Sequence, residues 1–289
     1  MDFLYNFPFT YSVDMNAIDS AVRDFSVKYS WFFDNIKMFI NSSVTGVNNF
    51  LNMIPWIFII ALVVFLGWKT TKKISKGLLY GMLLMVIGIT GLWSLMLETL
   101  SIIIVSVIIS LIFGLPIGIL VSTNDRADRI MRPILDTMQT MPVFVYLIPA
   151  LLFFGLGKAP AVIATTIYAI VPTIRLTNHG IRQIDEEVVE ASLAFGSTKF
   201  QSLVKVEIPQ ALPTIMQGVN QTLMMAMAMV VTTSMIGATG LGMEVLISVN
   251  RVEIGRGLVS GIAVVIIAVV IDRLTQGLVK CSEVKTDGQ

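Results

Sequence analysis

EVVEASLAFGSTKFQSLVKVEIP, residues 187–209, lies between two long apolar runs of the chain. Its charged residues recur at intervals, and each would be costly at the centre of a bilayer. Gly196 divides the stretch and is a natural C-terminal cap, while Ser197 or Thr198 can cap the start of a following helix. The pattern therefore predicts a helix, a sharp turn and a second helix that Pro209 interrupts, all outside the hydrocarbon layer.

The composition of the whole chain is that of a membrane protein. Hydrophobic residues make up 55% of the 289 positions and charged residues only 13%, against about 25% charged in a soluble domain. The net charge of +1 gives no sign of a nucleic-acid partner. The N-terminus has no basic region of the kind that opens a cleavable signal peptide, so insertion is expected to depend on later segments.

Seven apolar runs come near the roughly 20 residues that a spanning helix needs, which predicts an all-α, polytopic membrane protein. The fourth run is the weakest, because Pro142 and Pro149 bracket it. The predicted spans are Leu51–Trp68, Gly77–Met96, Thr99–Ser122, Met141–Leu156, Ala159–Leu176, Thr214–Ala238 and Leu258–Leu278.

The chain divides by composition into a leading segment, two sets of spans and a tail. Residues 16–47 have a helical period of apolar residues and predict an amphipathic helix in the membrane interface, which could brace the spans or dock a partner. We expect an N-terminal segment at 1–50, accessory spans at 51–96, a core at 97–278 and a cytoplasmic tail at 279–289. Within the core, residues 178–213 form the polar connection that contains the opening stretch.

Lysine and arginine are distributed unequally between the two sets of connections. The set that contains residues 69–76, 126–132 and 178–213 is the richer one, so the positive-inside rule places it in the cytoplasm. The N-terminus is then expected outside and the C-terminus inside.

The opening stretch resembles the EAA loop of ABC importer permeases. Glu190-Ala191-Ser192 is followed after three residues by Gly196, and after nine more by Val206-Glu207-Ile208-Pro209. The usual family pattern is E-A-A, three residues, G, nine residues, I-x-L-P, so Ser192 departs from it while the spacing is intact. In that family the loop docks into a separate ATPase subunit.

The resemblance implies a type I ABC importer permease fold and roles for the residues of the hairpin. Glu190 would fix the hairpin through hydrogen bonds to backbone amides or a basic neighbour, and Gly196 would permit the reversal. Phe195, Phe200 and Leu203 are the expected surface against the ATPase. The full set of expected coupling residues is Glu190, Ala191, Ser192, Phe195, Gly196, Phe200, Leu203, Val206, Ile208 and Pro209.

Five further motifs are similar to the glycine betaine/proline betaine subgroup of these permeases. They are residues 133–142, 172–175, 218–222, 240–242 and 272–276. The resemblance implies uptake of a quaternary ammonium osmoprotectant across a prokaryotic plasma membrane. It also implies a homodimer of permease chains, two ATPase subunits that carry the ATP and magnesium, and an external substrate-binding protein.

The sequence offers no catalytic constellation. It lacks a Walker A loop, so this chain is not expected to bind ATP, and the lone histidine, His179, makes no metal site. Polar and aromatic residues in or near the spans are the candidates for a translocation pathway, although the residue types of Phe144 and Tyr146 favour ordinary helix packing. The candidates are Gln139, Thr140, Phe144, Tyr146, Asn220, Gln221, Thr222, Met224, Met227 and Thr233.

Several alternatives remain open at the level of sequence. The cargo could be choline, carnitine or an amino acid, because specificity in such a system resides mainly in the binding protein. A stand-alone secondary transporter would need a buried ion-coupling acid or inverted repeats. It would leave the hairpin of residues 178–213 unexplained, as would a membrane scaffold without transport.

Overall fold

The computed structural model describes residues 14–286, and for Ile18 and residues 278–286 it describes only the backbone. Every regular element in the described part is helical, which confirms the predicted all-α class. The elements are α1 Met15–Lys28, α2 Ser30–Met53, α3 Trp56–Thr71, α4 Ile74–Ile89, α5 Trp93–Ser122, α6 Asp125–Thr140, α7 Val143–Phe154, α8 Lys158–Arg182, α9 Glu186–Ala194, α10 Lys199–Ser202, the π-helical turn η2 Leu203–Glu207, α11 Ile208–Ser234, α12 Leu241–Arg251 and α13 Ile254–Thr286.

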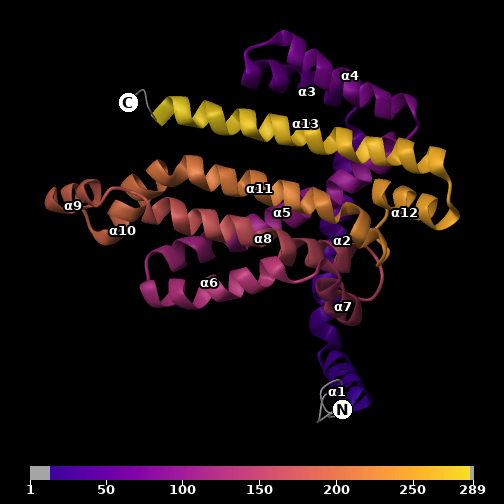
Figure 1. The fold of residues 1–289 in the computed structure, drawn as a ribbon, viewed down its shortest axis with the longest axis horizontal. Helices are drawn as coiled ribbons and strands as arrows, with labels where there is room; N and C mark the ends of the chain where they lie inside the picture. Colours follow the sequence, from indigo (N-terminus) through magenta and orange to yellow (C-terminus); the bar gives the residue numbers. More distant parts are fainter. Residues whose placement is uncertain (1–13, 287–289) are drawn as a thin grey trace, which may run out of the picture.

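Long helices form a bundle whose two ends differ. In Figure 1, α8, α11 and α13 run side by side, α9 and α10 project at one end, and α7 and α12 lie at the other. In the described part of the chain, four segments are long and apolar enough to cross a membrane, namely 93–122, 158–182, 199–234 and 254–277. The shortest of them has 24 residues, which is about 36 Å of helix and exceeds the roughly 30 Å of a hydrocarbon core. The chain is therefore a multi-pass membrane protein.

Two further pairs of helices would cross only as bent spans. α2 and α3 meet at 92°, and α6 and α7 meet at 94°. With both pairs included, the described part has up to six spans, so the expected seven are not confirmed. The predicted fourth span, residues 141–156, is wrong as a straight crossing, because α7 has only 12 residues and Pro142 caps it after a sharp bend.

The second predicted span, residues 77–96, is also wrong. α4 ends at Ile89, and Gly91 takes a left-handed φ of 75° in the turn that follows. α5 then begins at Trp93, six residues before the predicted start of the third span at Thr99. A hydropathy profile does not reveal the break between α4 and α5, because the turn carries no charged residue.

The N-terminal segment is two helices instead of the single predicted one. α1 and α2 are separated at Tyr29, and α2 continues to Met53. α2 runs across the bundle near the end that carries α7 and α12 (Figure 1). It buries only Ile40 and Val44, which pack with residues of α5, α7 and α8. The aromatic rings of Phe33 and Phe153 stack 4.7 Å apart and add a contact to α7.

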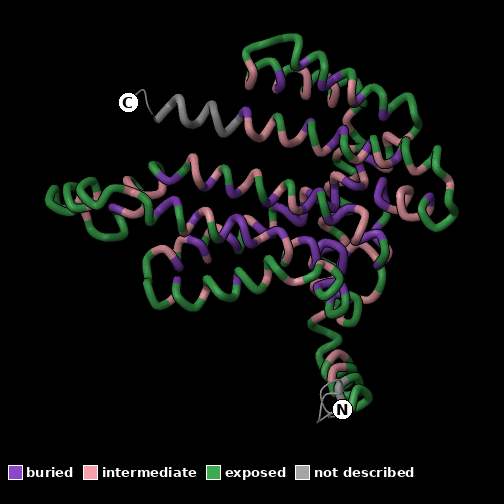
Figure 2. Tube along the Cα trace, viewed as in Figure 1, coloured by how far each residue is buried: buried purple, intermediate pink, exposed green. Residues whose placement is uncertain are grey.

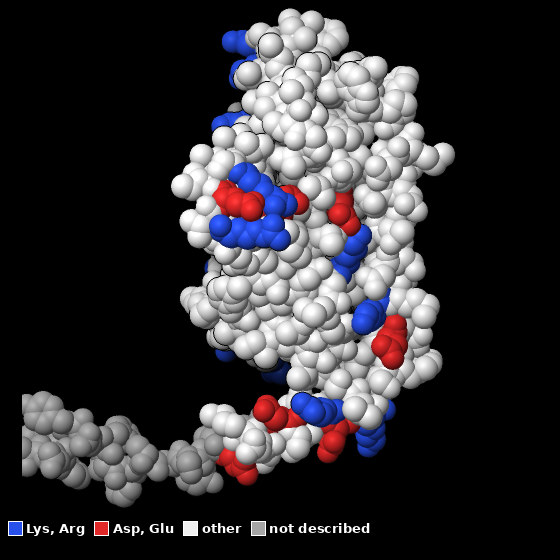
Figure 3. Space-filling view, turned by 90° about the vertical axis from the view of Figure 1, so that its right-hand side faces the viewer, with Lys and Arg blue, Asp and Glu red and all other residues white. Residues whose placement is uncertain are grey.

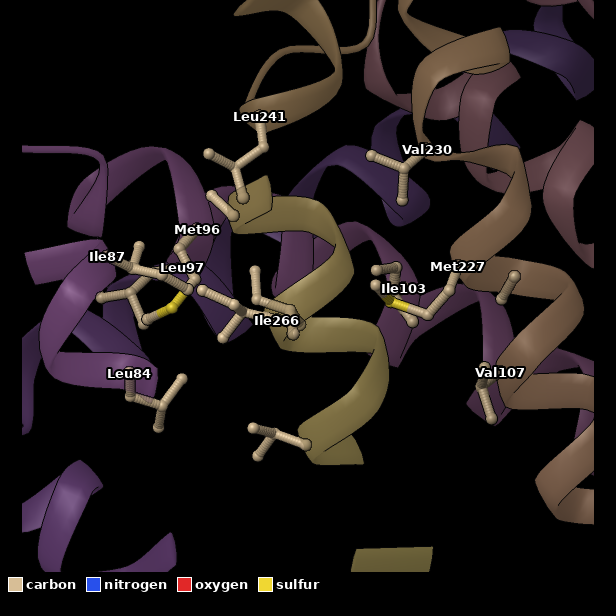
Figure 4. Close-up of a cluster of buried hydrophobic side chains, with 14 of the residues drawn as sticks. Leu84, Ile87, Met96, Leu97, Ile103, Val107, Met227, Val230, Leu241 and Ile266 are labelled. Atoms are coloured by element: carbon tan, nitrogen blue, oxygen red, sulfur yellow. The ribbon is translucent and has the colours of Figure 1, made fainter. Parts of the chain in front are cut away.

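The main core lies where α4, α5, α11, α12 and α13 meet. Figure 4 shows Ile266 of α13 beside Met96 and Leu97 of α5, with Leu241 from the start of α12 nearby. Figure 2 shows that buried positions concentrate along the bundle, whereas α9 and its turn are exposed. Packing therefore fixes the bundle and leaves the α9–α10 end free to meet another molecule.

A close backbone approach fixes α12 against α11. A Cβ atom at Gly242 would lie 2.2 Å from the carbonyl oxygen of Val230, a backbone atom that cannot rotate away. We expect Gly242→Ala to destabilise the fold by about 1–3 kcal/mol through overpacking, measured as a lower apparent Tm of the purified protein in detergent. Gly261→Ala is the matched control, because a Cβ atom there has nothing within 4 Å. Equal Tm changes in both variants would contradict the packing described here.

Candidate functional site

The polar connection between α8 and α11 is the predicted helical hairpin. Asp185 caps α9 by accepting a hydrogen bond from the Glu187 amide at 3.1 Å. Gly196 makes the reversal with a φ of 89°, a left-handed conformation that suits glycine. Thr198 caps α10, and it forms a capping box with Gln201 through bonds of 2.9 and 3.3 Å. Of the two predicted caps, Thr198 is the one used.

A hydroxyl pair joins the two arms of the hairpin. The hydroxyls of Ser192 in α9 and Ser202 in α10 lie 2.7 Å apart. Ser202 is only 1% exposed, so its polar side chain needs this partner. Ser192, the residue that departs from the usual E-A-A pattern, is therefore the one that ties α9 to α10.

The hairpin passes into α11 without a break. The prediction that Pro209 interrupts the second helix is wrong: η2 widens the helix so that the Ile208 amide donates to the carbonyl of Leu203, five residues earlier. Pro209 then occupies the first turn of α11, where a missing N–H is tolerated. The second arm and α11 consequently form one helical segment, residues 199–234.

The expected coupling residues divide between the outer surface and the base of the hairpin. Phe195 and Phe200 are 92% and 73% exposed, which is unusual for side chains of this size. Glu190, Ala191 and Pro209 are also exposed, and Val206 is half-buried. Phe195 and Phe200 thus supply a large apolar contact at the tip.

Two of the expected contact residues are half-buried. Leu203 and Ile208 pack against the cluster of Ile181, Ala211 and Ile215, and their contact with a partner stays a prediction. The carboxylate of Glu190 has no hydrogen bond or ion pair with any described residue. The bond that was expected to brace the hairpin is therefore absent from the isolated chain. This carboxylate is free to bind a partner.

Polar contacts between α6 and α8 fix the base of the hairpin, and none of them was predicted from the sequence. Asn178 donates to Asp128 at 2.7 Å, and Arg182 pairs with Asp125 at 2.7 Å. Arg182 also donates to the carbonyl of Val121 at 3.3 Å. The partners are 50 to 61 positions apart in the chain, so a local pattern could not reveal them.

The ten pathway candidates separate into a buried and an exposed group. The Thr222 hydroxyl lies 2.7 Å from that of Thr173, and Met227 and Thr233 are buried in helix contacts. Asn220 bonds to Asp272 at 3.2 Å and accepts from Thr275, and the Tyr146 hydroxyl donates to the carbonyl of Met138. The side chains that remain exposed are Gln139, Thr140, Phe144, Gln221 and Met224.

Charged side chains at the opposite end gather in mixed clusters. Lys158 pairs with Glu98 at 2.5 Å, and Thr239 donates to the same carboxylate at 2.6 Å. Arg256 pairs with Glu244 and Glu253 at 2.6 and 3.2 Å. Figure 3, which views this end, shows blue and red atoms together on an otherwise white surface. Within residues 14–277 no group of three potential ligands could hold a metal ion.

Comparison with known proteins identifies the family. Residues 110–283 match the binding-protein-dependent transport system inner membrane component. The chain is 44% identical over 264 residues to the glycine betaine transport system permease protein OpuAB of Bacillus subtilis, covering 91% of this chain and 93% of the relative. It is also 44% identical to the glycine betaine/carnitine transport permease protein GbuB of Listeria monocytogenes, covering 91% and 94%.

A solved structure shares the fold. An inward-facing conformation of the MetNI methionine ABC transporter matches with a TM-score of 0.60 at 23% identity, covering 66% of this chain and 95% of the solved chain. The chain belongs to the family of binding-protein-dependent transport system inner membrane components. It is a transport permease subunit with the type I importer permease fold.

The bond between the Ser192 and Ser202 hydroxyls is expected to stabilise the hairpin. Ser192→Ala leaves the buried Ser202 hydroxyl without its cross-hairpin partner, a cost of about 1–3 kcal/mol. We expect faster amide hydrogen exchange across residues 186–207. The double variant Ser192→Ala/Ser202→Ala removes both hydroxyls and should recover most of the protection. If the double variant exchanges as the sum of the two single variants, the pair is not coupled.

Proposed function

We propose that this chain is the transmembrane permease of an ATP-driven importer for glycine betaine or a related quaternary ammonium osmoprotectant. A partner subunit hydrolyses ATP and holds the ATP and magnesium, and this chain converts that hydrolysis into alternating access. The observation that carries the proposal is the hairpin itself, which exposes Phe195 and Phe200 at its tip. Its two arms lead into the long helices α8 and α11.

The hairpin is continuous with α11 through its second arm, and polar contacts hold its base at the end of α8. Residues 199–234 form one helical segment, and Arg182 at the end of α8 is tied to Asp125 and Val121. Because capping bonds and the Ser192–Ser202 pair brace the hairpin, a displacement of its tip moves α8 and α11 as rigid bodies instead of being lost in a flexible loop. Two-state rearrangement of packed helices is the usual form of such transitions.

The proposed complex contains two copies of this chain, two ATPase subunits and an extracytoplasmic binding protein in a prokaryotic plasma membrane. A second copy is supported by the end of α6, where the side chains of Gln139 and Thr140 are exposed. Such polar side chains are costly against lipid and suit an aqueous path or a subunit interface. The exposed candidates Phe144, Gln221 and Met224 remain predictions for the translocation pathway.

The cargo is proposed from the relatives and remains to be tested. The two relatives described above are named for glycine betaine and for glycine betaine or carnitine. Choline and amino acids are the further alternatives. A stand-alone secondary transporter is less well supported: Asp272 bonds to Asn220 and Gln276 at 3.2 and 2.7 Å, but such a mechanism gives the hairpin no role.

The proposed function predicts uncoupling when the tip loses an aromatic ring. Phe200→Ala should reduce glycine betaine-stimulated ATP hydrolysis in liposomes by at least tenfold (~1.4 kcal/mol), because a buried aromatic anchor contributes about 2 kcal/mol or more to an interface. Phe58→Ala is the control, since Phe58 is 65% exposed on α3, far from the hairpin in sequence. Undiminished stimulation in the Phe200 variant would count against the coupling role, and so would equal losses in both variants.

The proposed topology places the N-terminus outside and the C-terminus in the cytoplasm. Cys281 is the single cysteine of the chain, so a membrane-impermeant maleimide reports on the tail directly. In intact spheroplasts we expect no labelling of the wild type until the membrane is permeabilised. The variant Cys281→Ser/Ser20→Cys should be labelled without permeabilisation. The reverse pattern would invert the topology and place the hairpin on the wrong side for a cytoplasmic ATPase.

A further inference from the structure

A charged cavity lies between α6 and α8, close to the base of the hairpin. Its volume is about 490 Å³, and α5, α6 and α8 form its walls. Part of the wall is apolar, from Val121, Leu135 and Leu176, and part is charged, from Asp136 and Arg175. None of the ten pathway candidates lines it.

The charged groups around the cavity differ in how many of their polar atoms have hydrogen-bond partners. Both carboxylate oxygens of Asp128 have partners, Asn178 at 2.7 Å and Arg132 at 2.6 Å. Asp136 and Arg175 meet through one atom each, Oδ1 and Nη2, at 2.7 Å. Among the described residues neither side chain has another hydrogen bond, so Oδ2 of Asp136 and the other N–H groups of Arg175 are available.

We propose that this cavity is a transit site for a small zwitterion that carries a carboxylate and a quaternary ammonium group. The guanidinium of Arg175 binds the ligand carboxylate through two parallel N–H donors. The ammonium group cannot donate a hydrogen bond, so it lies beside the Asp136 carboxylate with its methyl groups on the apolar wall. The ligand and the pair are both neutral overall, so binding buries no net charge.

The position of the pair suits a site that must release its ligand. Asp136 and Arg175 are 66% and 43% exposed, and an ion pair so exposed contributes little by itself. The ligand can therefore displace or bridge it at small cost. Because Asp136 lies on α6 and Arg175 on α8, a step of the transport cycle that separates these two helices would change the spacing of the two charges. Binding strength would then vary through the transport cycle.

The direct test measures binding to this chain without the external binding protein. The permease assembled with its ATPase subunits is placed in nanodiscs of phosphatidylglycerol, which contain no zwitterionic head group to compete. Glycine betaine is then titrated and followed by saturation-transfer NMR of its methyl protons. We expect weak, saturable binding that Arg175→Gln weakens at least about tenfold, the usual effect of losing a hydrogen bond to a charged group. Asp136→Asn should also weaken it.

Two controls separate a binding site from a structural ion pair. Arg256→Gln breaks the ion pair with Glu244 at the other end of the bundle and should leave glycine betaine binding unchanged. Choline keeps the ammonium group but lacks the carboxylate, so its binding should be lowered by Asp136→Asn and not by Arg175→Gln. Equal affinity of wild type and Arg175→Gln for glycine betaine would overturn the proposal, and so would equal losses for both ligands in that variant.

This inference rests on the proposed function, and uptake by the full complex distinguishes the two failures. A wild-type complex that takes up no quaternary ammonium zwitterion contradicts both proposals. A complex that takes up glycine betaine, but whose permease binds it equally well with and without Arg175, contradicts the transit site alone.

Discussion

The structure depends on the close packing of α8 between α5 and α11. Gly114 and Gly118 of α5 lie so near Thr173 and Thr177 that an added Cβ atom would come within 2.9 and 2.7 Å of those side chains. The same Thr173 side chain also joins α8 to α11, because its hydroxyl bonds to that of Thr222. In a membrane, where lipid is as apolar as the side chains, such close contacts and interhelical hydrogen bonds are what hold helices together. α8 is thus the element through which a movement at one end reaches the rest of the bundle.

This packing anchors the base of the hairpin to the helices of the bundle. Its first arm, α9, follows α8 after a short connection, and its second arm, α10, continues through η2 into α11. The tip of the hairpin, in contrast, packs against little of the chain, because Phe195 and Phe200 are largely exposed. A rigid element that is well anchored at its base and exposes aromatic rings at its end is suited to transmit force from a bound partner.

The sequence predicted the hairpin well because its signals are local. The turn at Gly196 and the cap at Thr198 each depend on one or two neighbouring residues, and both are confirmed. The passage of the helix through Pro209 was missed, because a π-helical turn leaves no residue signature of its own. The bond between Ser192 and Ser202 requires the turn between them to be known first, although the serine in place of alanine was a hint.

Longer-range features could not be inferred from one sequence. The turn at Gly91 is apolar like the helices beside it, so hydropathy merged α4 with the start of α5. The Asp128–Asn178 and Asp136–Arg175 contacts join residues about 40 to 50 positions apart, and each member alone resembles an ordinary surface polar residue. Membrane spans, in contrast, were placed to within a few residues wherever a long helix was flanked by charge, as in α8 and α13.

In the proposed mechanism, the tip of the hairpin binds directly to an ATP-hydrolysing subunit. A photoreactive benzoylphenylalanine in place of Phe195 in the assembled complex tests this contact, with the same replacement at Trp31 of α2, which is 78% exposed, as the reference. Illumination should link the Phe195 position, and not the Trp31 position, to the ATPase subunit, with the adduct identified by mass spectrometry. An adduct from Trp31 alone, or none from Phe195 in a complex that still hydrolyses ATP in response to substrate, would contradict the account.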